Sequence, residues 1–347
     1  MDASAATAPG PATAPGPATV QASAVGPAPG PTAMPLRRLS GGGGDWAFAL
    51  LTRAAAWGVF LLLIGIAASM LWGGRQAFQT FGFGFLFSDA WDVGRNKYGA
   101  LIPIYGTLVS SAIAMLIAVP TSFGIAVFLA EVAPRWVRSP IAIAVELLAA
   151  VPSIVYGMWG LFFFAPVMSA RVEPWLVAHV GPLPILGPLF QGAPIGIGML
   201  TAGIILAIMI IPFISSVMRD VFQAVPPELR ESAFALGATP WEIIRRVTLP
   251  HTRSAVIGAI FLGLGRALGE TMAVTFVIGN SFNFSKSLLA PGNSIASAIA
   301  NEFAEAEGLH RSALIAIGFL LFVVTFIVLA AAKLMLARLS RGDGRAA

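Results

Sequence analysis

Six long apolar runs limit what this chain can fold into. They lie at residues 54–72, 101–130, 140–167, 196–218, 254–279 and 312–336. A helix needs about 20 apolar residues to cross a bilayer, at a rise of about 1.5 Å per residue. Only 11% of the residues are charged, whereas a soluble domain carries about 25%. We therefore predict an all-α, polytopic membrane protein with six transmembrane helices.

The N-terminal segment 1–44 differs sharply from the rest of the chain. It consists largely of Ala, Pro, Gly, Thr and Ser, with the sequence TAPGPA at 7–12 and again at 13–18. Such a composition buries little apolar surface, and the segment lacks the layout of a secretory signal peptide. We predict a disordered cytoplasmic tail at 1–44, a membrane domain at 45–340 and a C-terminal tail at 341–347. Binding of a partner is the alternative interpretation of the N-terminal tail.

Lysine and arginine are divided unequally between the two sets of connecting segments. Of the 21 such residues, six lie on loops that would share one side of the membrane: Arg75, Arg95, Lys97, Arg171, Lys286 and Arg311. Apart from Arg266, which is inside a span, the others fall on the opposite side, together with both termini. Because basic residues are enriched in cytoplasmic loops, we predict that both termini and the polar stretch at 219–253 are cytoplasmic.

This polar stretch carries clear helix signals. Pro227 suits the first position of a helix, where its missing N–H is not needed. Gly237 can end that helix, because glycine readily adopts the left-handed conformation. Thr239, Pro240 and Glu242 then have the spacing of a capping box that starts a second short helix. We expect this second helix to stop by Pro250.

The same stretch resembles the coupling loop of ABC-importer permeases, whose pattern is EAA-x3-G-x9-I-x-LP. The matching residues are Glu231, Ser232, Ala233, Gly237, Val247, Leu249 and Pro250. Ser232 and Val247 depart from the pattern, but both changes are small or conserve shape. In this family the loop docks into a groove of a cytoplasmic ATPase and transmits its closure. A generic helical hairpin is the alternative.

The apolar run at 254–279 carries Arg266 and Glu270 near its middle. An ionisable residue there costs about 2.5–3.5 kcal/mol on insertion scales, so both should face the bundle interior or water. Being four residues apart, they should share one face of a helix. The segment RALGETMAV at 266–274 resembles the phosphate-specific branch of the family, with a PstC-like subunit. The resemblance continues through 151–160 and 294–307, and it covers roughly residues 45–340.

Arg266 is the only lysine or arginine far from both predicted interfaces, which makes it the first candidate for a substrate-pathway residue. A guanidinium matches the oxygens of phosphate. Glu270 would hold the arginine or compete with the anion, and Thr271 could add a hydroxyl donor. A fixed ion pair that holds this helix against a neighbour is the alternative. Glu146 is a second acid inside a predicted span, and the sequence does not identify its partner.

The resemblance also implies a MetI-like ABC permease fold and a bacterial cytoplasmic (inner) membrane location. It implies three partners: a second, PstA-like permease subunit, a PstB-like ATPase dimer and a PstS-like phosphate-binding protein. The chain lacks a Gly-x4-Gly-Lys-Ser/Thr loop, so we expect ATP and Mg²⁺ to be used by the ATPase, with no cofactor in this chain. We therefore expect a permease subunit that is not itself an enzyme.

Two rival functions stay open, and a third, an intramembrane enzyme, fails for want of catalytic residues. A permease for another oxyanion, such as sulfate or molybdate, would keep the coupling loop and change the surroundings of the arginine. An ion-gradient-driven carrier or channel would leave the coupling loop unexplained. An intramembrane enzyme would need a catalytic constellation, but Glu146 and Glu270 lie on different predicted spans. The chain has no cysteine, and its three histidines lack the spacing of metal ligands.

The loop at 280–310 contains one more predicted helix, at 293–306. Ile295, Ile299 and Phe303 lie near helical spacing, which predicts a short amphipathic helix at the outer surface. Glu302, Glu305 and Glu307 make this region acidic. Since acidic groups repel phosphate, we expect a docking or gating surface there, with a solvated helix face as the alternative.

Overall fold

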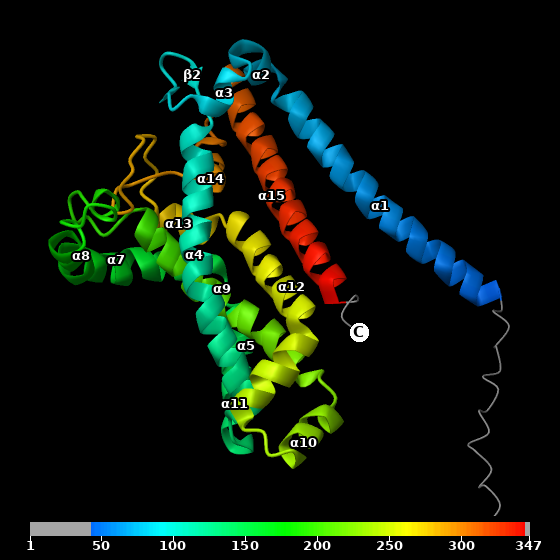
Figure 1. Cartoon of the computed structure of the whole chain (residues 1–347). Helices are drawn as coiled ribbons and strands as arrows, with labels where there is room; N and C mark the ends of the chain where they lie inside the picture. The colour runs from blue at the N-terminus through cyan, green and yellow to red at the C-terminus, as the bar shows by residue number, and fades with distance from the viewer. Residues whose placement is uncertain (1–42, 344–347) are drawn as a thin grey trace, which may run out of the picture. The chain divides into compact units, whose positions relative to one another are not determined.

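The computed structural model describes residues 43–343 and places most of them in helices (Figure 1). The predicted tail at 1–44 lies outside the described residues except for its last two positions, as do residues 344–347. The chain divides after Phe60 into two units. The described part of the first unit is the beginning of α1, and the second unit, Leu61–Ala347, holds the other described elements.

The α-helices are α1 (Gly43–Gly73), α2 (Arg75–Phe81), α3 (Gly84–Phe87), α4 (Leu101–Val127), α5 (Arg135–Ala150), α6 (Ser153–Trp159), α7 (Ala165–Val167), α8 (Glu173–His179), α9 (Met199–Gln223), α10 (Pro227–Ala235), α11 (Pro240–Ile243), α12 (Leu249–Leu268), α13 (Met272–Val277), α14 (Ile295–Glu302) and α15 (Gly308–Asp343). Four π-helical turns lie between some of them: η1 (Phe128–Val132), η2 (Gly160–Phe164), η3 (Met168–Val172) and η5 (Ile244–Thr248). A 3₁₀ turn, η4, covers Gly187–Leu189. Two short strands, β1 (Trp91–Asp92) and β2 (Lys97–Tyr98), pair antiparallel, with Trp91 opposite Tyr98.

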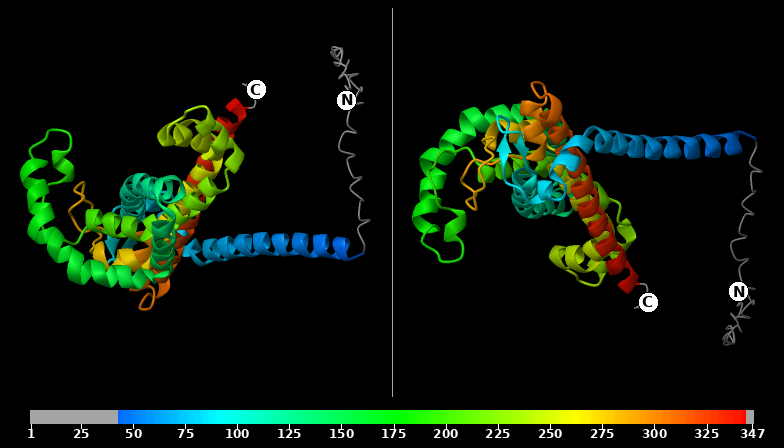
Figure 2. Two further views of the ribbon diagram at one scale, coloured as in Figure 1. Left: turned by 90° about the horizontal axis from the view of Figure 1, so that it is seen from below. Right: turned by 90° about the horizontal axis from the view of Figure 1, so that it is seen from above.

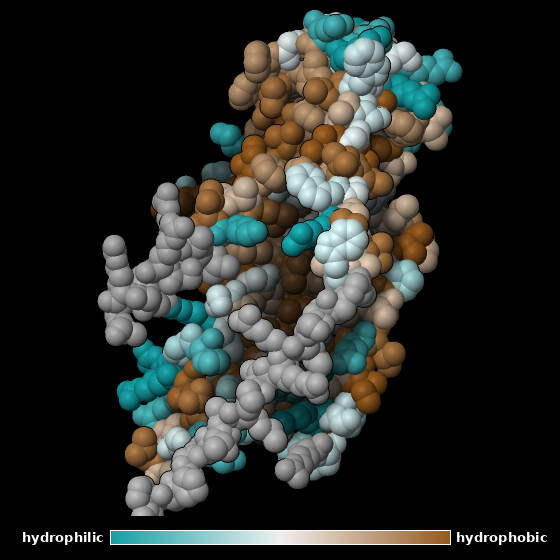
Figure 3. All heavy atoms as spheres, turned by 90° about the vertical axis from the view of Figure 1, so that its right-hand side faces the viewer, coloured by the Kyte–Doolittle hydropathy of each residue, from teal (hydrophilic) through white to brown (hydrophobic). Residues whose placement is uncertain are grey.

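Within the described residues, six helical stretches are long and apolar enough to cross a membrane. They are Trp46–Gly73, Leu101–Val132, Ser153–His179, Met199–Gln223, Pro240–Leu268 and Gly308–Leu334. This confirms the predicted number of spans. Apolar side chains cover much of the face shown in Figure 3, and hydrophilic ones gather at its upper end.

The third span is displaced from its predicted position at 140–167. α5 ends at Ala150, and a new helical stretch begins at Ser153 and continues to His179. Val151 has extended backbone angles (φ −63°, ψ 130°), because a following proline, here Pro152, disfavours the helical conformation. From Ser153 onward, α6 to α8 form a curved helical arm at the side of the bundle (Figure 2).

The fifth span is also displaced, from 254–279 to 240–268. The helix does not stop at Pro250, since α11, η5 and α12 form one continuous stretch. The π-helical turn η5 ends at Thr248, two residues before Pro250, and its wider turn tolerates a proline that lacks a backbone N–H. The helix ends instead at Gly269, a residue type that favours helix ends. The polar connection after α9 is therefore shorter than the predicted 219–253.

α9 lies at the centre of the bundle. Its side chains Ile205, Ile210 and Ile214 are fully buried. Glycine residues let two neighbouring helices, α4 and α12, approach α9 closely. A Cβ at Gly263 of α12 would lie 2.4 Å from the Cδ1 atom of Ile214, and a Cβ at Gly203 would lie 2.6 Å from the Cγ2 atom of Ile113 on α4. Close packing of small residues stabilises helix pairs in membranes, where lipid provides no hydrophobic drive.

The predicted amphipathic surface helix at 293–306 is wrong in both extent and burial. The helix α14 covers Ile295–Glu302, and Ile295, Ser297 and Ala298 are fully buried. Its first backbone N–H groups are satisfied internally: the Ile295 amide donates to Thr107 Oγ1 at 3.0 Å, and the Ser294–Ser297 capping box closes the N-terminus. The first half of this helix lies in the core, whereas Ala300 and Asn301 are exposed, and the acidic side chains follow at its C-terminal end.

Candidate functional site

The polar loop after α9 forms the helices that its local signals predict. Pro227 is the first residue of α10, and Gly237 follows that helix with a φ of +83°. Thr239 caps α11: the Glu242 amide donates to Thr239 Oγ1 at 3.4 Å, and the Thr239 amide donates to Glu242 Oε2 at 3.0 Å. These three predictions are confirmed.

Three of the residues that match the coupling-loop pattern, Ala233, Gly237 and Val247, line one hollow. It has a volume of about 360 Å³, and it is lined by Ala233, Leu236, Gly237, Ala238, Glu242, Ile243, Arg246 and Val247. Glu231, Ser232 and Pro250 are exposed beside it, whereas Leu249 is half-buried and packs against the core. The first half of the pattern thus faces solvent, and its last part joins the membrane helix.

Large apolar side chains are exposed on the same loop. Leu236 is 89% exposed, and Trp241 and Phe234 are more than half exposed. Apolar surface of this kind on a polar segment marks an interaction site when it is contiguous with a groove. The loop therefore has both the hollow and the exposed apolar residues that a docking surface needs.

Arg266 and Glu270 do not share one helix face, because the helix ends between them. α12 stops at Leu268, and α13 begins at Met272. The Arg266 guanidinium lies over the ring of Phe213, with Cζ 5.4 Å from the ring centre. Glu270 accepts a hydrogen bond from the Ala273 amide at 3.2 Å, at the start of α13. Among the described residues no ion pair joins Arg266 to Glu270.

The three predicted pathway residues at this break differ in exposure. Arg266 is exposed, whereas Glu270 and Thr271 are half-buried. The Thr271 hydroxyl makes a long contact of 3.5 Å with the Gly269 carbonyl, and its own carbonyl accepts from the Thr275 amide. The three predicted pathway residues therefore lie close together at one helix break, with the guanidinium as the accessible group.

Comparison with known proteins identifies the family. Residues 122–341, more than half of the chain, match the family model described as binding-protein-dependent transport system inner membrane component. The chain is 62% identical over 300 residues to the phosphate transport system permease protein PstC of Xylella fastidiosa (strain 9a5c), covering 86% of this chain and 93% of that protein. It is 55% identical over 298 residues to the protein of that name from Pasteurella multocida (strain Pm70), with the same coverage. The chain belongs to this family, in its PstC branch.

A solved structure supports the fold of this permease. A chain of a bacterial alginate ABC transporter, solved with an alginate pentasaccharide-bound periplasmic protein, matches with a TM-score of 0.55 at 19% identity. The match covers 86% of this chain and 96% of that one. The expected ABC permease fold is thereby confirmed. With its six spans, the permease is a multi-pass inner membrane protein of a transporter complex with further subunits.

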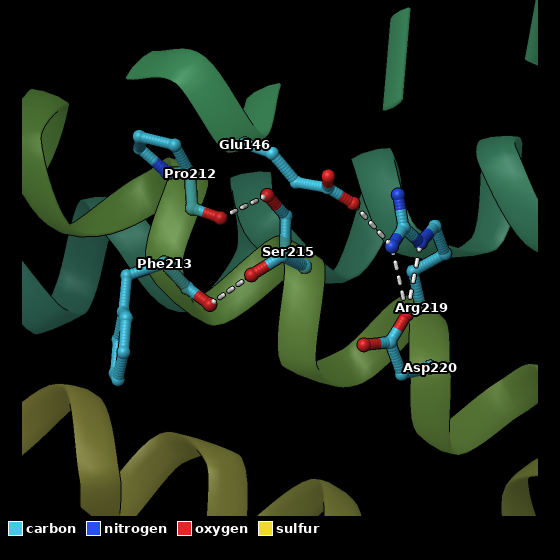
Figure 4. A network of polar contacts seen from close by, with 7 residues as sticks. Glu146, Pro212, Phe213, Ser215, Arg219 and Asp220 are labelled. Carbon is cyan, nitrogen blue, oxygen red and sulfur yellow. Dashed lines mark hydrogen bonds and ion pairs between the residues drawn. The ribbon is translucent and has the colours of Figure 1, made fainter. Parts of the chain in front are cut away.

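Glu146, whose partner the sequence does not identify, pairs with Arg219 of α9 (Figure 4). The Arg219 Nη2 atom lies 2.8 Å from Glu146 Oε1 and 2.8 Å from Asp220 Oδ1. Glu146 lies on α5, ahead of the displaced third span, and its side chain is 55% exposed. The sequence missed this pair because 73 residues separate its members. In Figure 4 the Phe213 side chain, which contacts Arg266 of α12, points away from the Glu146–Arg219 pair.

Proposed function

We propose that this permease is one of two membrane subunits of an ATP-driven importer of inorganic phosphate. It would form half of the translocation pathway, with a PstA-like subunit as the other half. The observation that carries this proposal is the 54–62% identity to PstC permeases of phosphate transport systems over 86% of the chain. The exposed guanidinium at the helix break supplies a chemical reason for an anion substrate.

Arg266 is our candidate for the residue that contacts the ion. An exposed arginine within a candidate span must meet water or a partner subunit, since lipid cannot solvate it. Contact with the face of Phe213 leaves the edges of the guanidinium, which carry its N–H donors, available for phosphate oxygens. Glu270 and Thr271 would act beside it: Glu270 holds the start of α13, and Thr271 offers a hydroxyl.

The loop around α10 and α11 would dock the ATPase. Its exposed Leu236 and Trp241 and the adjoining hollow suit insertion into a groove of a PstB-like ATPase dimer. ATP and Mg²⁺ would be used there, in a separate subunit. A PstS-like phosphate-binding protein would deliver the ion on the opposite side. The distribution of lysine and arginine favours a cytoplasmic loop and cytoplasmic termini.

Transport by the complete complex tests this function. Cells that lack their own phosphate importer would carry this permease with the two other subunit types and the binding protein. We expect uptake of radiolabelled phosphate that excess unlabelled sulfate or molybdate does not reduce. Uptake of sulfate or molybdate in place of phosphate would assign the permease to another oxyanion. Uptake that continues without the ATPase would instead favour an ion-gradient-driven carrier.

A further inference from the structure

A buried ion pair lies where the coupling loop meets the membrane helices. Arg230 of α10 places its Nη2 atom 3.1 Å from Glu131 Oε1, and it also donates to the Phe222 carbonyl at the end of α9. The two charged side chains are only 19% and 12% exposed. The contact with Glu131 is an ion pair, and the hydrogen bond of Arg230 goes to the Phe222 carbonyl. Opposite charges attract more strongly where water is largely excluded.

The same carboxylate also binds the fifth span. Thr248 Oγ1 donates to Glu131 Oε1 at 3.2 Å, and Thr248 is 1% exposed. Both residues lie in π-helical turns, Glu131 in η1 and Thr248 in η5. Such turns are rare and occur frequently at functional sites. One oxygen atom thus connects the ends of two spans with a helix of the coupling loop.

A second arginine fixes the turn that presents Glu131. The Arg138 Nη2 atom, from α5, donates to the Ala130 carbonyl at 3.0 Å. This contact satisfies a carbonyl at the end of the second span, where an intrahelical donor is missing. By contrast, none of the nine residues of α10 is buried. α10 therefore lies outside the core, and Arg230 extends from it to the fixed carboxylate.

We propose that the Arg230–Glu131 pair transmits the movement of α10 to the second and fifth spans during transport. The inference rests on the proposed function, in which the ATPase moves this loop. Arg230 and Glu131 are then positioning residues, which touch neither ATP nor phosphate. The apolar docking side chains Leu236 and Trp241 belong to other positions of the loop. Loss of the pair should therefore separate ATP hydrolysis from transport while the ATPase stays bound.

The test uses the complete complex, purified and reconstituted in vesicles with the binding protein. Three quantities are measured: ATPase retained on the permease, ATP hydrolysed, and phosphate taken up per ATP. For Arg230→Gln and Glu131→Gln we expect normal retention, continued hydrolysis and a fall of about tenfold in uptake per ATP, within the range typical of coupling between sites. The double variant should be no worse than either single one, because the two residues act as a pair.

Two further variants make the result decisive. Arg245→Gln removes a positive charge from an exposed position on the same loop and should leave uptake per ATP nearly unchanged. Thr248→Val removes one hydrogen bond to Glu131 without changing charge, and it should lower uptake per ATP by a smaller factor. If the Gln variants fail to assemble, Thr248→Val tests the proposal alone, and an unchanged uptake per ATP in this variant would contradict it.

Some outcomes would overturn the proposal. An unchanged ratio of uptake to ATP in the assembled Gln variants would show that the pair has no part in transmission. Equal losses of retained ATPase, hydrolysis and uptake would make it a structural contact only, as would an equal effect of Arg245→Gln. A wild-type complex that carries another oxyanion would refute the phosphate assignment alone, because the ratio can be measured with that ion.

Discussion

Two arginines of this permease, Arg266 and Arg230, lie in opposite surroundings. Arg266 is exposed at the last turn of α12 and contacts an aromatic face. Arg230 is 19% exposed and is bound by a carboxylate and a carbonyl. A guanidinium whose donors are taken by a fixed carboxylate offers few of them to a passing anion, whereas one on a ring keeps its edges free. The contrast separates a residue suited to contact with substrate from one suited to holding helices together.

Substitution of Arg266 should give the largest loss of transport. If Arg266 contacts the anion as proposed, Arg266→Gln removes hydrogen bonds to a charged ligand, each worth about 1.5–3 kcal/mol, and we expect uptake to fall by about 10- to 100-fold. The thermal stability of the permease should hardly change, because the side chain is exposed. Radiolabelled uptake at equal membrane levels measures the first quantity, and thermal unfolding of the purified complex measures the second.

Arg171→Gln is the matched control for this substitution. Arg171 is also an exposed arginine within a candidate span, on the π-helical turn η3. We expect it to retain near-normal uptake. Equal losses in the two variants would mean that uptake responds to general positive charge, and Arg266 would lose its place on the pathway.

Substitution of Arg230, unlike that of Arg266, should lower the stability of the permease. Arg230→Gln leaves the Glu131 carboxylate without its cation in a mostly buried site, which should lower the free energy of unfolding by about 1–3 kcal/mol. Adding Glu131→Gln should recover part of this loss, because the unpaired charge is removed. Thermal unfolding of the two variants and the wild type checks this order. Equal melting temperatures for Arg230→Gln and Arg266→Gln would abolish the contrast between the two sites.

Glu270 sharpens the comparison at the helix break. Its carboxylate accepts from the Ala273 amide at 3.2 Å, so Glu270→Leu leaves a first-turn amide of α13 without this acceptor. Losing a side-chain acceptor at a helix start costs about 0.5–2 kcal/mol. We expect uptake to fall less than in Arg266→Gln, with Glu270→Gln falling between the wild type and the leucine variant. A larger loss of uptake for Glu270→Leu than for Arg266→Gln would indicate that Glu270 itself contacts the ion or Arg266.

The sequence predicted where the two helices of the polar loop begin, because those signals are local. Proline at N1, glycine at the helix end and the Thr239–Glu242 box each act within a few residues, so neighbouring sequence determines them. The prediction that Arg266 and Glu270 share one helix face is wrong, because the helix ends before Gly269 and does not continue to Glu270. The third span was misplaced for a similar reason, since the break before Pro152 was treated as the interior of a helix.

Contacts between distant segments could not be predicted from the sequence. Glu146 meets Arg219, and Arg230 meets Glu131, only because α4, α5 and the coupling loop fold against α9. The burial of α14 is of the same kind, since it depends on which helices surround it. An ionisable residue directly after an apolar run, as Glu131 and Arg219 are, is a signal in the sequence, but it does not identify the partner.

The smallest effect should come from the capping box of the coupling loop. Thr239→Ala removes the hydroxyl that accepts from the Glu242 amide at 3.4 Å, at an exposed helix start. The cost should be about 1 kcal/mol, confined to α11. Because α11 continues into the fifth span, the membrane helix holds most of the loop in place, and uptake should fall less than twofold. Hydrogen exchange of the loop amides would detect the local loosening. Protection unchanged at Glu242 would show that the hydroxyl contributes nothing to this helix start.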